Sequence, residues 1–115
     1  MPRFLLSVIQ PDGPAPPPQM LDRIMRDVDA VNREMDEAGV MVLRAGLSPA
    51  PEATVVRAKD GGMLVTDGPF AETKEQLGGF YIIDCQNLDE ALAWAANVPD
   101  AALGSIEVRP MLELG

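Results

Sequence analysis

The sequence contains no histidine, a single cysteine and a single tyrosine among its 115 residues. Without histidine the chain cannot build a Ser-His-Asp or Cys-His nucleophilic site, use imidazole as an acid or base near pH 7, or ligate a metal through imidazole. Cys85 cannot form an internal disulfide and belongs to no Cys/His cluster. We therefore predict a chain suited to a reducing compartment, with no metal and no cofactor.

Basic side chains and long apolar runs are also scarce. Nine Lys and Arg stand against 18 Asp and Glu, the net charge is −9, and no basic stripe is present, so we predict no nucleic-acid partner. The apolar run at residues 4–9 is shorter than the core of a secretion signal and far below the ~20 residues that span a bilayer. We predict a cytoplasmic protein without membrane contact, folded as one domain over residues 1–115.

Helical periodicity is strongest between about residue 19 and residue 38. Apolar residues recur there at intervals of three and four, with charged residues on the opposite side. The apolar set is Leu21, Ile24, Met25, Val28, Val31, Met35 and Ala38. Gly39 then supplies a left-handed stop. A second helix is predicted after Asn87, which forms a capping box with Glu90.

Strand patterns flank both helices. Strands are predicted at residues 4–9, 40–44, 54–58, 63–66, 80–85 and 105–111. The segment 59–62, Lys-Asp-Gly-Gly, tolerates the positive φ of a tight turn and therefore predicts a β-hairpin. Residues 71–76 are polar and compatible with one helical turn, and Gly78 and Gly79 precede the next strand.

The order β-α-β, hairpin, β-α-β predicts a ferredoxin-like α+β sandwich with an added β-hairpin, in which two helices cover one face of an antiparallel sheet. Such a sandwich leaves the other face uncovered. Residues 4–9, 40–43 and 80–83 are nevertheless apolar at consecutive positions, so both faces of these strands require burial. We predict a homodimer in which two sheets pack face to face as a dimeric α/β-barrel. The alternative is a monomer whose own loops cover the open face.

One segment carries a family resemblance. The stretch VTDGPFAETKEQLGGFYIID, residues 65–84, closely resembles the signature of DGPF-domain proteins in the YCII-related group, and the similarity extends over nearly the whole chain. The resemblance implies a small, cytoplasmic, dimeric α/β-barrel of bacterial type, in a family whose members mostly lack an assigned activity. Some DGPF-domain proteins are associated with extracytoplasmic-function sigma factors. The His-Asp pair of other YCII-like proteins cannot be transferred, because this chain has no histidine.

The DGPF motif has a structural and a functional interpretation. Asp67, Gly68 and Pro69 are typical turn residues, but the turn could also aim Asp67, Glu72 and Lys74 into a cleft. Glu72 and Lys74 lie in a polar stretch and are more readily interpreted as solvated surface charges, because acid–base work near neutral pH would require burial. Phe70 is predicted to act as a hydrophobic plug rather than as a platform for a ligand.

The strand that follows the motif holds the remaining acid–base candidates. Asp84 ends an otherwise apolar strand, where it is either a perturbed carboxylate or a capping residue at the strand end. Tyr81 and Phe80 point to opposite faces, and Tyr81 is the better candidate for a pocket because a buried hydroxyl needs a hydrogen bond. Cys85 is predicted to be a core residue.

Two arginines complete the candidate site. Arg44 and Arg109 could donate forked hydrogen bonds to a carboxylate ligand, or pair with the surrounding acidic residues. The sequence thus predicts a homodimer whose inter-sheet cleft binds a small polar or anionic organic molecule, with any catalysis being metal-free proton transfer by Asp67 or Asp84 with Tyr81. The alternative is a non-catalytic interaction module, and the sequence leaves open whether the protein is an enzyme.

Overall fold

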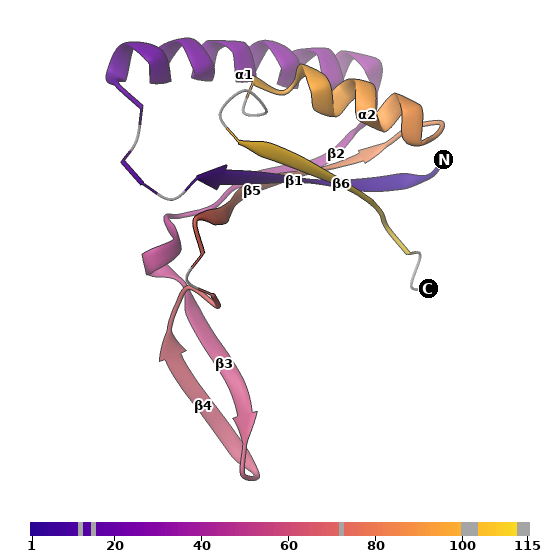
Figure 1. The fold of residues 1–115 in the computed structure, drawn as a ribbon. Helices are drawn as coiled ribbons and strands as arrows, with labels where there is room; N and C mark the ends of the chain where they lie inside the picture. The colour runs from indigo at the N-terminus through magenta and orange to yellow at the C-terminus, as the bar shows by residue number, and fades with distance from the viewer. Residues whose placement is uncertain (12, 15, 72, 100–103, 113–115) are drawn as a thin grey trace.

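The computed structural model describes residues 1–11, 13–14, 16–71, 73–99 and 104–112. Its elements are β1 (Arg3–Pro11), α1 (Pro18–Ala38), β2 (Met41–Gly46), the 3-10 turn η1 (Ala50–Glu52), β3 (Thr54–Lys59), β4 (Gly62–Asp67), β5 (Glu75–Asp84), α2 (Leu88–Asn97) and β6 (Ser105–Pro110). β2, β5, β1 and β6 form a four-stranded sheet in that order, with antiparallel neighbours. Both helices cover one face of it (Figure 1). The predicted ferredoxin-like sandwich is confirmed.

Local sequence signals set the helix ends. Gly39 ends α1 in the left-handed conformation at φ 72°, where a glycine avoids the steric cost of a side chain. At α2 the backbone amide of Glu90 donates to Asn87 Oδ1 at 2.9 Å, and Glu90 Oε2 accepts from the amide of Gln86 at 2.7 Å. The predicted stop and the predicted cap at Asn87 are both confirmed, while the returning bond of the capping box goes to Gln86 instead of Asn87.

The core lies between the sheet and the helices. It is apolar throughout and combines alternate residues of β1 and β5 with the inner sides of both helices. Its members are Phe4, Leu6, Val8, Val31, Met35, Val40, Tyr81, Ile83, Cys85, Ala91, Ala95 and Val98. Trp94 of α2, the single tryptophan, is partly buried and packs against this cluster.

The apolar stripe of α1 is buried only near its C-terminal end. Val31 and Met35 are in the core, whereas Leu21 and Met25 are exposed. Figure 1 shows the first turns of α1 extending beyond α2, so fewer elements lie beneath them. The prediction of a continuously buried stripe is therefore wrong for this half of the helix.

β5 is longer than predicted and replaces the expected helical turn at residues 71–76. It starts at Glu75, because Gln76 and Leu77 pair with Gln10 and Ile9 of β1. Gly79, predicted to precede the strand, lies within it. A Cβ at Gly79 would lie 2.8 Å from the carbonyl oxygen of Ala45 on β2, so the glycine permits the close approach of these two strands.

The second sheet is the predicted hairpin of β3 and β4. Its turn places Asp60 at φ 50° and Gly61 at φ 80°, which are the left-handed angles that tight hairpin turns require. Figure 1 shows this hairpin projecting from the four-stranded sheet on the side opposite the helices. Within the described ranges, neither helix is both long enough and apolar enough to cross a membrane.

Candidate functional site

The face of the four-stranded sheet that turns away from the helices is apolar at its centre. We call it the open face. Strand register assigns its residues, because directly paired residues lie on the same side of a sheet. Leu5 pairs with Ile82, and Ser7 with Phe80, at positions that alternate with the core residues Phe4, Leu6 and Tyr81. Leu43 of β2 pairs with Ile82 and is 51% exposed. The prediction that strand segments are apolar on both faces is confirmed for β1 and β5.

Charged side chains occupy one end of the open face and its edge on β6. Arg3 and Asp84 are paired in register on β1 and β5 and form two parallel hydrogen bonds, from Arg3 Nε to Asp84 Oδ1 at 2.7 Å and from Arg3 Nη2 to Asp84 Oδ2 at 3.0 Å. On β6, Arg109 Nη2 lies 2.6 Å from Glu107 Oε1. Arg109 pairs in register with Leu5, and Glu107 with Ser7. The open face thus joins an apolar centre to a charged end at Arg3 and Asp84 and to a charged edge on β6.

The guanidinium of Arg3 controls the ionisation of Asp84. Its hydrogen bond to the carboxylate is the main cause that lowers the pKa of Asp84, and its positive charge adds to the effect, while desolvation opposes it. Asp84 is therefore an ionised acceptor at neutral pH and a weak base. This placement favours the interpretation of Asp84 as a group that binds or orients.

Asp84→Asn is expected to lower the free energy of unfolding at pH 7. The folded-state pKa of Asp84 lies below its unfolded value, so the stabilisation is complete above the ordinary carboxyl pKa of about 4 and is lost as the pH falls through the lowered pKa. The difference between parent and variant should therefore shrink on acidification, as measured by urea unfolding across that range. Arg3→Met should cause a similar loss at pH 7, and the double variant little more. A difference that is constant with pH would contradict the assignment.

Tyr81 lies on the opposite side of the sheet from the one predicted. It is 6% exposed and belongs to the core beneath the helices, while Phe80 lies on the open face. The alternation of the two rings is confirmed, but the assignment of their faces is reversed. The physical reason is that Tyr81 pairs with Leu6, whose side chain is fully buried under the helix layer.

The residues of the DGPF segment lie on or beside the hairpin. Asp67 ends β4 and is exposed, as is Lys74. Phe70 is 73% exposed, and the guanidinium of Arg57 lies 4.9 Å from the centroid of its ring. The prediction that Phe70 plugs an apolar gap is therefore wrong within one chain. Glu72 lies outside the described residues.

The three acid–base candidates do not converge within one chain. Asp67 is on the hairpin, Tyr81 is in the core, and Asp84 is on the open face. Glu75 is the first residue of β5, on the side of the hairpin, and Asp84 is the last. Because ten extended residues span about 30 Å, Asp84 lies roughly this far from the start of the strand.

The two arginines predicted to bind a ligand lie on different faces. Arg44 is paired in register with core-facing Tyr81, and its Nη1 donates to Asp36 Oδ1 of α1 at 3.0 Å. Arg109 lies on the open face beside Glu107. The alternative that both arginines pair with acidic neighbours is confirmed, and Arg109 alone of the two belongs to the open face.

Cys85 is fully buried, as predicted. Burial is the main cause that raises the pKa of its thiol, with a further contribution from Glu90, so the protonated, unreactive form dominates at neutral pH. Among the described residues, no group of three or more Cys, Asp and Glu side chains is placed to hold a metal ion.

Sequence reasoning missed Arg3 and Ser7 as members of the candidate site. Both alternate with the core residues of β1 and therefore share the open face with Leu5. That alternation is visible in the sequence, but the pairing of Arg3 with Asp84 joins residues 81 positions apart and leaves no local signal.

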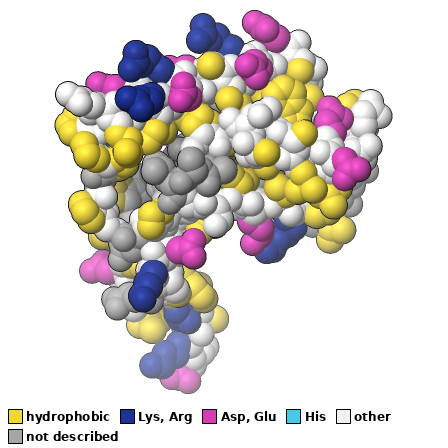
Figure 2. Space-filling view, turned by 45° about the horizontal axis from the view of Figure 1, so that its top comes forward, with side chains coloured by type: hydrophobic (Ala, Val, Ile, Leu, Met, Phe, Trp, Pro, Cys, Tyr) yellow, Lys and Arg dark blue, Asp and Glu magenta, His cyan; other side chains and the backbone are white. Residues whose placement is uncertain are grey.

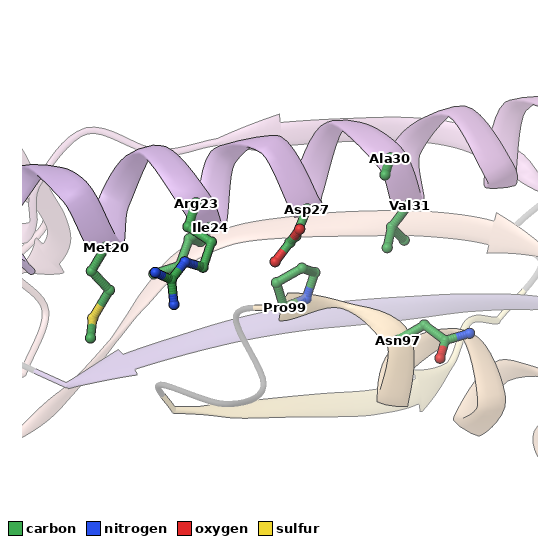
Figure 3. Close-up of a pocket in the computed structure, with 8 residues that line it drawn as sticks. All are labelled: Met20, Arg23, Ile24, Asp27, Ala30, Val31, Asn97 and Pro99. Atoms are coloured by element: carbon green, nitrogen blue, oxygen red, sulfur yellow. The ribbon is translucent and has the colours of Figure 1, made fainter.

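A groove on the helix side holds none of the predicted site residues. It has a volume of about 460 Å³ and runs between α1 and the end of α2 (Figure 3). Its lining residues are Met20, Arg23, Ile24, Asp27, Ala30, Val31, Asn97 and Pro99. Arg23 and Asp27 are the charged side chains among these lining residues, and most of the others are apolar. The groove therefore offers fewer polar groups to a ligand than the open face does.

The helix layer and the antiparallel sheet define a protein with a ferredoxin-like α+β fold. The sequence model of the YCII-related domain matches residues 4–114, and the chain belongs to this family. An uncharacterized protein of Rhizobium meliloti (strain 1021) is 51% identical over 92 residues, which cover 78% of this chain and 74% of the relative.

A solved structure shares the fold at low sequence identity. It is the 5-chloro-2-hydroxyhydroquinone dehydrochlorinase TftG from Burkholderia phenoliruptrix AC1100, in complex with 2,5-dihydroxybenzoquinone. The TM-score is 0.53 at 17% identity, and the alignment covers 98% of this chain and 95% of the other. This likeness shows the fold, while the function has to be argued from the residues of this chain.

Proposed function

We propose that the protein is a homodimer in which two open faces pack against each other, and that the cleft between them binds a small polar or anionic organic molecule. The observation that carries this proposal is the composition of the open face. Apolar residues fill its centre, Arg3 and Asp84 lie at one end, and Arg109 and Glu107 lie along the adjoining β6 edge.

The apolar centre supports association through this face. Leu43 is half exposed, and Leu5, Phe80 and Ile82 keep part of their surface accessible in the single chain. Exposed apolar surface of this kind marks sites of association. The alternative, a monomer whose own loops cover the face, is not supported by the described residues, because the hairpin projects away from the sheet (Figure 1).

The charged end and the charged β6 edge support an anionic ligand. Arg109 is 70% exposed on its side chain, and its planar fork of N–H donors suits a carboxylate. Arg3 holds Asp84 ionised, so this pair can accept and donate hydrogen bonds at fixed positions. Phe80, which is partly exposed, adds an aromatic surface. Because Asp84 is a weak base, the role that we propose for it is ligand orientation.

The proposed setting of this dimer is the cytoplasm. Its single thiol, Cys85, is buried and free, and the acidic composition offers no basic surface for nucleic acid.

Arg109→Met is expected to weaken ligand binding about tenfold or more, because it removes charge-assisted hydrogen bonds while retaining most of the side-chain volume. A metabolite library screened by thermal shift supplies the ligand, and calorimetry measures the affinity. Arg33→Met on α1 is the matched control and should bind as the parent does. Equal affinities in both variants would exclude Arg109 from the site, and a dimeric parent without any ligand in the library would count against the binding function.

The second candidate is a non-catalytic interaction module. The observation in its favour is the exposed first half of α1, where Met20, Leu21 and Met25 are exposed and Met20 lines the helix-side groove. In that case no metabolite should raise the melting temperature. The open face, which combines charged and apolar groups, favours the ligand-binding function.

A further inference from the structure

The hairpin of β3 and β4 has one face that is apolar at its centre and one mixed face, which carries Arg57 and Lys59 together with Val55 and Leu64. Pairing places Val56 opposite Val65 and Ala58 opposite Met63, so these four side chains share one face. Arg57, paired with Leu64, lies on the other face, where Lys59 also points because residues alternate along a strand. We call the hairpin the arm, and the face with Val56, Ala58, Met63 and Val65 the apolar face of the arm. Its four central residues carry no charge.

This apolar face is uncovered in the single chain. Val56 is 55% exposed, Met63 68% and Val65 62%. Figure 2 shows apolar side chains at the surface of the protruding hairpin. A two-stranded ribbon is marginally stable in water by itself, and a group of apolar side chains that are each more than half exposed marks a surface for association. The arm therefore lacks a partner surface within the single chain.

The arm stands on the same side of the sheet as the open face (Figure 1). Its strands have six residues each and are about 20 Å long, whereas two packed sheets lie about 10 Å apart. A second chain seated on the open face would therefore lie beside the arm along the full thickness of its sheet. The Cα radius of gyration, 16.2 Å, exceeds the roughly 13 Å of a compact domain of this length, as expected for a chain shaped to embrace another.

We propose that the hairpin is a clasp that packs its apolar face against a second copy of this chain and closes the side of the inter-sheet cleft. This inference rests on the homodimer proposed above. A second copy fits better than an unrelated partner, because a two-fold axis through the open faces gives each chain one arm and one receiving edge. The charge pattern agrees, since Arg57 and Lys59 remain on the solvent side and the acidic chain meets an uncharged surface.

The test compares two double variants of β4, each of which introduces two glutamates on a single face. Met63→Glu with Val65→Glu alters the apolar face, and Leu64→Glu with Thr66→Glu alters the opposite face of the same strand. The first pair is expected to raise the dimer dissociation constant about tenfold, because carboxylates would have to be desolvated in an apolar contact. The control pair should change it by about twofold or less. Sedimentation equilibrium measures both, and circular dichroism verifies the fold.

Photo-crosslinking identifies the occupant directly. With p-benzoylphenylalanine in place of Met63, irradiation of the purified protein should give a covalent dimer, whereas the same group in place of Lys59 should give little. A dimeric parent whose association is unaffected by the β4 variants would overturn the clasp and leave the open-face dimer intact. A monomeric parent would overturn both. Crosslinks in cells exclusively to a different protein would also overturn the clasp.

Discussion

Leu43→Asp should convert the proposed dimer into a 12.3 kDa monomer at micromolar concentration. Leu43 lies on the open face and is 51% exposed in the single chain, so a charge there is hydrated in the monomer and desolvated in the dimer. Each chain contributes one such charge to a symmetric interface. We expect the dissociation constant to rise about 100-fold, which corresponds to ~2.7 kcal/mol.

Leu92→Asp is the matched control for this experiment. Leu92 is on α2, on the other side of the sheet, and is 47% exposed. Both variants replace a half-exposed leucine with the same charge, and only the first lies on the open face. If the two variants sediment alike, the proposed interface is wrong.

Leu6→Ala is expected to cost about 3 kcal/mol of unfolding free energy. Leu6 is fully buried between Tyr81 on β5 and Val108 on β6, its register partners on either side. Removing its branched end leaves a cavity that a closely packed core fills poorly, and buried leucine truncations cost roughly 2–5 kcal/mol. The melting temperature should fall by roughly 10–15 °C.

The exposed Leu112 provides the control for this truncation. It is 83% exposed, so Leu112→Ala should change the unfolding free energy by about 0.5 kcal/mol or less. All melting curves need the same protein concentration, because association stabilises the folded state. A loss below ~1 kcal/mol for Leu6→Ala would contradict the assignment of Leu6 to a tight core.

The helix ends and the hairpin turn were predictable because their causes are local. Asn87 and Glu90 are three residues apart, and the left-handed angles at Asp60 and Gly61 follow from the turn residues themselves. The start of β5 was not predictable in this way. Residues 71–76 are polar enough for a helical turn, but pairing between Gln76 and Gln10, which are remote in the sequence, extends the strand instead.

The candidate site was predictable only in part, for a related reason. Alternation separates Phe80 from Tyr81, but it does not state which face the helices cover, and that choice depends on how the whole sheet is assembled. Arg109 was assigned to the site from its strand position. Its companions Arg3 and Ser7 were missed, because their proximity to Asp84 and Glu107 arises from pairing between strands that are remote in the sequence.

Trp94 gives these experiments an internal fluorescent reporter. The side chain of this single tryptophan packs against the core from α2, so the full thickness of the sheet separates it from the open face. Its emission should change when the hydrophobic interior comes apart and stay nearly constant when a colourless ligand occupies the cleft. Denaturation and ligand occupancy can therefore be followed independently in the same cuvette.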